Sequence, residues 1–222
     1  VYSFLMFILV RNVVQYTLLA LLYQLAQSGA SGGLVDLLIL RDETGAYNGY
    51  SGDVSSIIAA LGFIGGALAV WSTAKLLITK NKEDMHLSHL KKEGKAKYAL
   101  LVAATIGAVI GFNLLFELLG VTNKSEAYTE VVSQQYSAHF IVGILVFGFI
   151  SPIAEELLFR GVIYGYLRRF MDLKLAIALS ALIFGVYHMN YVQGIYGFLI
   201  GCLMAYAYEY FGEFKMAVLV HV

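Results

Sequence analysis

Charged residues in this chain are gathered into a few short segments, and the sequence between those segments forms long apolar stretches. Several of the stretches reach about 18 residues or more, which lets a helix cross a hydrocarbon core of about 30 Å at about 1.5 Å per residue. Only 14% of the 222 residues are charged and 59% are apolar, whereas a soluble domain usually carries about 25% charged residues. The chain is therefore predicted to be an integral membrane protein.

Hydropathy predicts six complete membrane spans and the beginning of a seventh near residue 216. The six predicted spans are 1–26, 54–79, 98–119, 139–159, 173–192 and 194–211. Lipid offers no partner to backbone N–H and C=O groups, and the sequence has no alternating β pattern, so every span is expected to be helical. The predicted fold is an all-α, polytopic transmembrane helix bundle with seven or eight helices in the whole protein.

Lysine and arginine are distributed unevenly between the predicted loops. Segment 80–97 holds six of them and segment 160–174 holds four, whereas 27–53 and 120–138 hold one each. Because cytoplasmic loops of membrane proteins are enriched in these residues, 80–97 and 160–174 are predicted to be cytoplasmic. The chain is expected to be a multi-pass protein of a plasma membrane, most simply a bacterial one.

The net charge and the cysteine content exclude two other kinds of protein. The formal net charge is zero, which leaves no basic face to neutralise the phosphates of a nucleic acid. Cys202 is the single cysteine of the sequence, so the chain forms no internal disulfide. No nucleic-acid partner is expected.

Segment 150–161 (ISPIAEELLFRG) places three ionisable residues inside or beside a predicted span. Each such group costs roughly 2.5–3.5 kcal/mol on membrane-insertion scales, and each therefore calls for an explanation. Glu156 and Arg160 are four residues apart and are predicted to pair on one helix face. Glu155 points about 100° away and is free to face another helix. Pro152 is expected to bend this helix.

Two histidines lie on later predicted helices. Phe184 and His188 are four residues apart and share a face, and His221 lies at the end of the sequence. Glu155 could act as a general base on a water while both histidines stabilise the oxyanion. Alternatively, Glu155, His188 and His221 could bind Zn²⁺ and leave one coordination position open. The sequence leaves both readings open, so the presence of a metal is unknown.

In this order the motifs resemble those of the CPBP family of intramembrane endopeptidases, which includes the type II CAAX prenyl proteases and the bacterial Abi proteins. The family motifs EExxxR, FxxxH and HxxxN or HxxxD correspond here to Glu155-Glu156-x-x-x-Arg160, Phe184-x-x-x-His188 and His221. The resemblance covers about 139–222, which is predicted to be the catalytic core. Residues 1–138 are predicted to supply N-terminal transmembrane helices and loops of the same membrane domain.

The resemblance implies a glutamate-dependent intramembrane protease that hydrolyses a peptide or a membrane-protein segment near the cytoplasmic face. Glu155 would activate water, and His188 and His221 would stabilise the oxyanion. Glu156, Arg160 and Phe184 would be positioning residues. The Asn or Asp of the third family motif falls four residues beyond His221, so the sequence is expected to be truncated at this end.

A different class of function is a non-catalytic scaffold or immunity protein that binds and controls another membrane protein. The enzyme is favoured because a scaffold has no reason to bear the cost of burying Glu155, His188 and His221. The expected partners are accordingly the lipid bilayer and a peptide or membrane-protein substrate, with another membrane protein under the scaffold alternative.

Arg11 and Gln15, in the first span, are expected to pair with another helix or with a partner protein.

The predicted span boundaries place Glu155 and His188 at different depths in the membrane, although the two residues are expected to act together. With a span ending at 159, Glu155 lies near the cytoplasmic face, whereas His188 lies roughly 21 Å inside the membrane. The preferred solution is that 161–171 continues the helix toward the cytoplasm.

Four pairs of glycines at i and i+4 are expected to mark close helix contacts. These pairs are Gly62/Gly66, Gly107/Gly111, Gly161/Gly165 and Gly197/Gly201.

Overall fold

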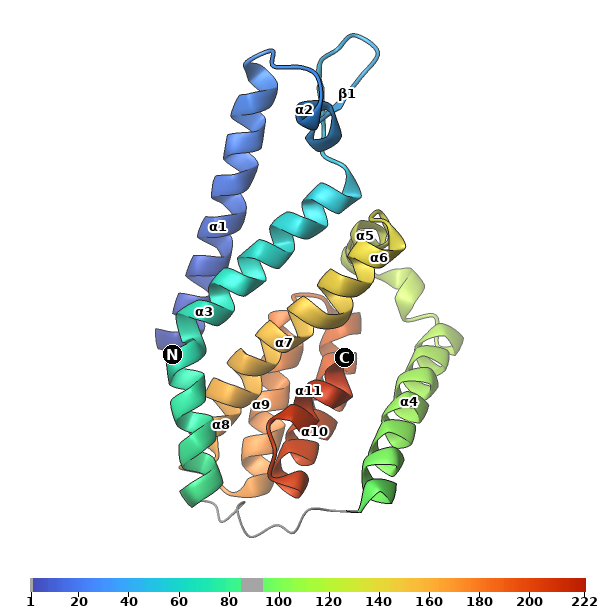
Figure 1. Cartoon of the computed structure of the whole chain (residues 1–222). Coiled ribbons are helices and arrows are strands. Elements are labelled where there is room, and N and C mark those ends of the chain that lie inside the picture. Colours follow the sequence, from blue (N-terminus) through green and yellow to red (C-terminus); the bar gives the residue numbers. More distant parts are fainter. Residues whose placement is uncertain (1, 85–93) are drawn as a thin grey trace.

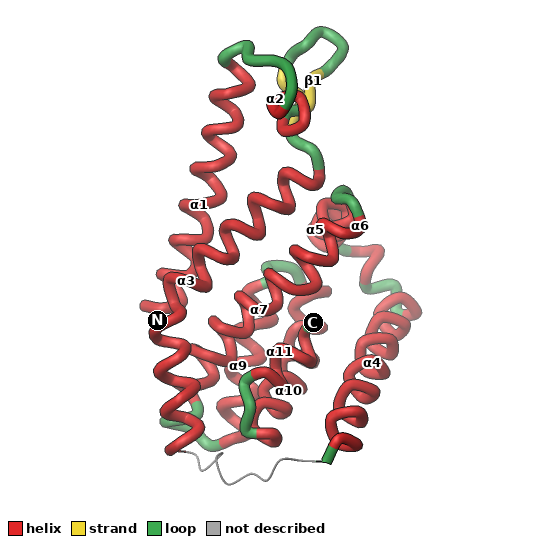
Figure 2. Tube along the Cα trace, viewed as in Figure 1, coloured by secondary structure: helices red, strands yellow, loops and turns green. Residues whose placement is uncertain are grey.

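The computed structural model describes residues 2–84 and 94–222, and almost all of its regular structure is helical (Figures 1 and 2). Five helices are long and apolar enough to cross a membrane: α1 (Tyr2–Gln27), α3 (Gly52–Asp84), α4 (Lys95–Leu118), a composite helix over Phe140–Leu167 and α10 (Tyr191–Phe211). The prediction of an all-α, polytopic helix bundle is confirmed. Residues 85–93, half of the predicted cytoplasmic segment 80–97, lie outside the described residues.

The composite helix Phe140–Leu167 carries the carboxylate motif. It consists of α6 (Phe140–Gly143), the π-helical η3 (Ile144–Ile150), α7 (Ser151–Glu156), the π-helical η4 (Leu157–Tyr164) and α8 (Gly165–Leu167). The predicted end at 159 is wrong, because the helix runs on to Leu167, in line with the preferred solution that 161–171 continues the helix. Pro152 lies at the start of α7, between the two π-helical segments. There the Ser151 N–H bonds the Val146 carbonyl, five residues back, so the backbone around the proline is wider than a regular α-helix.

Helix α9 (Leu173–Tyr187) is shorter than the predicted span 173–192. Its 15 residues cover roughly 22 Å, which is less than the hydrocarbon thickness. The helix stops because Met189 adopts a positive φ of 56°, and because Asn190 caps α10 by accepting a hydrogen bond from the Gln193 N–H. His188 therefore occupies the carboxyl end of α9 and not the interior of a full span.

The remaining elements connect or complete the bundle. Between α1 and α3 lie α2 (Leu34–Leu38) and a small antiparallel hairpin of β1 (Leu40–Arg41) and β2 (Tyr47–Gly49). The short helix η2 (Thr122–Lys124) and α5 (Glu126–Tyr136) connect α4 to the composite helix. After α10 the chain turns at Gly212, in the left-handed region, and α11 (Lys215–His221) runs back along the bundle toward α7 (Figure 1).

Three of the four predicted glycine pairs lie at helix contacts. A Cβ at Gly62 or Gly66 would touch Gln15 or Phe7 of α1, and one at Gly161 would touch Ala74 of α3. Likewise, Gly165 faces Asn81, Gly197 faces Gly185, and Gly201 faces Ala181 and Arg160. The prediction is wrong for Gly107/Gly111, because no atom of the described residues lies within 4 Å of a Cβ at either position. Helix α4 contacts α10 and α11, and its Phe112 and Phe116 rings pack against Tyr196 of α10.

Candidate active site

The predicted pair of Glu156 and Arg160 is formed in the centre of the bundle. Both side chains are fully buried, and Arg160 Nη1 donates to Glu156 Oε1 over 2.8 Å. Arg160 Nη2 donates to the Gly201 carbonyl of α10 over 2.9 Å, and the guanidinium carbon lies 4.7 Å from the ring centroid of Phe184. Arg160 thus ties the composite helix to α9 and α10 and neutralises one of the two adjacent carboxylates.

Glu155 faces a different neighbour, as its position on the helix predicted. The residue is only 6% exposed, and its Oε1 accepts a hydrogen bond from Ser151 Oγ over 3.1 Å. Its Oε2 lies 3.8 Å from His221 Nε2, which is too long for a direct hydrogen bond. One carboxylate oxygen is therefore held by Ser151, and the other faces an imidazole across a narrow gap.

His221 lies between the two glutamates. Its Nδ1 is 2.9 Å from Glu156 Oε1, and because an ionised carboxylate only accepts, Nδ1–H is the donor. This hydrogen bond turns Nε2 toward Glu155. Short α11 brings His221 to this position by running back from the turn at Gly212 to pack against α7.

His188 joins the group through an aromatic ring. Its Nδ1 lies 2.9 Å from the Phe184 carbonyl, which can only accept, so Nδ1–H is again the donor. The Phe184 ring contacts His188 at a centroid distance of 4.8 Å and His221 at 5.5 Å, edge to face in both cases. Within 2–84 and 94–222 no hydrogen bond or ion pair joins His188 directly to Glu155. The structure thus brings Glu155 and His221 together, and the Phe184 ring contacts both His221 and His188.

The zinc arrangement is not formed by the side chains as they stand. Among the described residues no three His, Cys, Asp or Glu side chains gather closely enough to hold a metal ion. Both ring nitrogens of His221 face carboxylates, and His188 does not join them. The donor set that the zinc reading requires from Glu155, His188 and His221 is therefore not assembled.

Several residues of this site were not predicted from the sequence. Ser151 precedes Glu155 by four residues and so shares its helix face. Its contact with Glu155 could therefore have been predicted from this spacing. The contact of Arg160 with the Gly201 carbonyl could not have been predicted, because every residue type has a main-chain carbonyl. Arg11 of α1 donates a hydrogen bond to the Tyr187 hydroxyl, which confirms that Arg11 pairs with another helix. Gln15, for which the same was expected, donates to the Ala59 carbonyl of α3.

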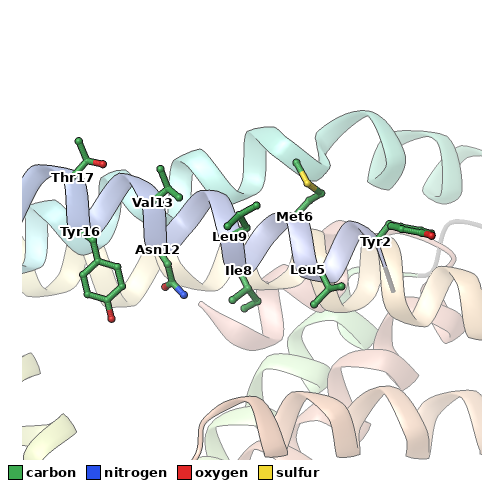
Figure 3. A pocket seen from close by; sticks show the side chains of 9 residues that line it. All are labelled: Tyr2, Leu5, Met6, Ile8, Leu9, Asn12, Val13, Tyr16 and Thr17. Carbon is green, nitrogen blue, oxygen red and sulfur yellow. The ribbon is translucent and has the colours of Figure 1, made fainter.

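A groove of about 720 Å³ lies on the outer surface of α1, away from these residues (Figure 3). The nine residues that line it all come from α1 itself, between Tyr2 and Thr17. None of the predicted site residues is among them. The groove is a feature of the exposed face of α1 and not part of the carboxylate and histidine cluster.

A buried glutamate and a nearby histidine, set among helices that cross a membrane, are typical of an intramembrane hydrolase. Comparison with known families agrees: residues 137–222 match the family model of the type II CAAX prenyl endopeptidase Rce1-like proteins. The matched segment coincides with the part of the chain, about 139–222, whose motifs resemble those of the CPBP family. No curated protein and no solved structure matches the chain.

Proposed function

We propose that the protein is a glutamate-dependent intramembrane endopeptidase in which Glu155 activates the attacking water. The observation that carries this proposal is the gap of 3.8 Å between Glu155 Oε2 and His221 Nε2. A water about 2.8 Å from both atoms fits across such a gap and bonds both of them. Ser151 holds the other oxygen of the carboxylate, so that Glu155 presents Oε2 in a defined direction.

The chemistry follows from this arrangement. Glu155 takes a proton from the water as the water oxygen bonds to the carbonyl carbon of the scissile peptide. The carbonyl oxygen becomes an oxyanion, and the protonated Glu155 then gives its proton to the leaving amide nitrogen while the C–N bond breaks. His188 and His221 stabilise the oxyanion when protonated, because only then does each carry an N–H at Nε2.

Glu156, Arg160 and Phe184 are positioning residues in this proposal. Glu156 accepts from both Arg160 and His221, so it fixes the orientation of the imidazole without facing the proposed water. Phe184 packs against both histidines and under the Arg160 guanidinium. Loss of any of the three is expected to displace His221 or His188 relative to Glu155.

The depth of the site supports a reaction inside the membrane that is reached from the cytoplasmic side. Glu155 lies twelve residues before the end of the composite helix at Leu167, roughly 18 Å along it, and His188 follows the roughly 22 Å of α9. The two residues are thus at comparable depth, and the sequence-based conflict disappears. The excess of Lys and Arg supports a cytoplasmic location for Leu167 and for the loop 80–97, and the membrane in this proposal is a bacterial plasma membrane. An impermeant thiol reagent tests this: cysteines placed near Lys174 and near Lys124, with Cys202 replaced by Ser, should react from opposite sides.

The test of the activity compares cells that produce the full-length protein with cells that produce Glu155→Gln at equal levels. All new peptide termini in membrane and medium fractions are read by mass spectrometry. Termini that disappear with Glu155→Gln, but remain with the matched exposed control Glu130→Gln, establish the protease and identify its cleavage site. Unchanged termini, together with full rescue of the deletion phenotype by Glu155→Gln, would instead leave the scaffold alternative.

A further inference from the structure

Neither histidine, while neutral, has a free N–H that could donate to an oxyanion. His188 uses its Nδ1–H for the Phe184 carbonyl, and His221 uses its Nδ1–H for Glu156. A neutral imidazole has one N–H only, so each neutral histidine offers a lone pair at Nε2 and no donor. An oxyanion needs donors that are in place before charge develops. A donor that does not depend on protonation of a histidine would meet this need.

The Tyr187 hydroxyl is such a donor. Tyr187 is the residue before His188, and its ring packs edge to face against Phe159 and against His188, at centroid distances of 5.2 and 5.6 Å. Its hydroxyl oxygen accepts a hydrogen bond from Arg11 Nη1. Among the described residues the Tyr187 O–H itself has no acceptor, so its proton is available to a group that enters the site.

Arg11 has an environment that is unusual for a charge in a membrane helix. Its guanidinium stacks on Phe63 of α3 at 4.2 Å, but within 2–84 and 94–222 it forms no ion pair, and its Nε is buried without a partner. An uncompensated cation inside a span is costly and usually marks a function. Its one hydrogen bond points to Tyr187, so the positive charge is directed at the hydroxyl beside the histidine.

We propose that Tyr187 is a further catalytic residue that donates a hydrogen bond to the oxyanion, and that Arg11 is a positioning residue acting through it. This inference rests on the proposed function of Glu155. As the carbonyl oxygen gains negative charge, the Tyr187 O–H donates to it and keeps its own proton. Arg11 holds the phenol oxygen and polarises the O–H bond, because a donor that itself accepts a charge-assisted bond is strengthened. The arginine thereby contributes to the site from α1, outside the segment 137–222 that matches the family.

The test measures kcat and KM of the purified full chain with a quenched fluorescent peptide that spans the cleavage site identified with Glu155→Gln. Tyr187→Phe should lower kcat by about 10²–10³-fold, the usual effect of losing one oxyanion donor. KM should stay nearly unchanged, since the bond forms only in the transition state. Arg11→Gln should lower kcat by a smaller factor, and Arg11→Lys should restore part of the loss. Tyr166→Phe, a mostly exposed tyrosine, is the matched control and should leave kcat unchanged.

A double-mutant cycle separates action through Tyr187 from a merely structural role. If Arg11 acts through the hydroxyl, Arg11→Gln has no further effect on kcat once Tyr187 is Phe. An equal effect in both backgrounds overturns the role of Arg11, and wild-type kcat in Tyr187→Phe overturns the whole inference. Glu155→Gln is measured alongside: if it is inactive while Tyr187→Phe is fully active, the inference fails alone. If Glu155→Gln retains activity, the proposed function fails first. Melting temperatures in detergent show whether a loss of kcat reflects unfolding.

Discussion

Helix α4 and the composite helix Phe140–Leu167 are both apolar enough to span a membrane, yet they differ in how much of their surface is buried within the protein. In the most apolar stretch of α4, 6% of the residues are buried within the protein, compared with 44% in the composite helix. Asn113 of α4 donates to the Val109 carbonyl of its own helix, and among the described residues no atom lies within 4 Å of a Cβ at Gly107 or Gly111. In the composite helix, Arg160 and Glu156 bond each other and also reach the Gly201 carbonyl of α10 and His221 of α11.

This difference shows what an intramembrane polar residue indicates. Hydropathy identifies both helices as spans, but ionisable groups mark the one that lies inside the bundle, because a charge facing lipid has no partner. The same comparison applies to two arginines. Both arginines have a buried Nε without a partner among the described residues. Arg160 nevertheless bonds Glu156 and the Gly201 carbonyl, whereas Arg11 bonds one tyrosine hydroxyl and lies over the rings of Phe63 and Tyr187. The first is part of the internal structure, and the second is available for chemistry.

The largest expected effect on stability comes from the better satisfied arginine. Arg160→Met leaves Glu156 as an uncompensated buried charge, so it should lower the free energy of unfolding by about 3–5 kcal/mol. Arg11→Met removes a cation that has no ion-pair partner among the described residues, and its cost should be much smaller. Unfolding of both variants in mixed detergent micelles measures the difference. Equal losses would contradict the distinction between the two arginines.

A smaller effect is expected from glycines on the two kinds of helix. A Cβ at Gly185 of α9 would lie 2.4 Å from the Gly194 carbonyl oxygen of α10, so Gly185→Ala forces the helices apart and should cost about 1–3 kcal/mol. Gly111→Ala on α4 meets no atom within 4 Å and should be neutral or slightly stabilising, since alanine favours helix more than glycine. Melting temperatures of the two variants, measured side by side, provide the check. A loss at Gly111 as large as that at Gly185 would show that α4 packs against something in the membrane.

The smallest of these effects concerns the orientation of Glu155. Ser151→Ala removes the hydrogen bond to Glu155 Oε1 and leaves the carboxylate free to rotate, which should lower kcat about tenfold, a loss of about 1.4 kcal/mol. Ser137→Ala, which removes an exposed serine outside the bundle, should leave kcat unchanged. Kinetics on the same quenched peptide test the pair. An unchanged kcat in Ser151→Ala would mean that Glu155 is held by other contacts.

Much of the fold and part of the site could be predicted from residue order alone. Charge clustering located the spans because the hydrocarbon core excludes charges wherever they fall in the chain. The spacing of Glu156 and Arg160 predicted their ion pair, since partners four residues apart are brought together by helix geometry alone. The same spacing placed Ser151 on the face of Glu155, although its role was not predicted.

The tertiary structure alone decided which helices meet and how deep each residue lies. The end of α9 at Tyr187 depends on the backbone of Met189 and on the cap at Asn190, and a hydropathy window averages over both. The position of His221 between Glu155 and Glu156 depends on the return of α11, and the contact of Arg11 with Tyr187 joins two helices far apart in the sequence. Contacts within one helix follow from a fixed period of 3.6 residues. Contacts between helices depend on how the surfaces of all of them pack together, which no short pattern of residues encodes.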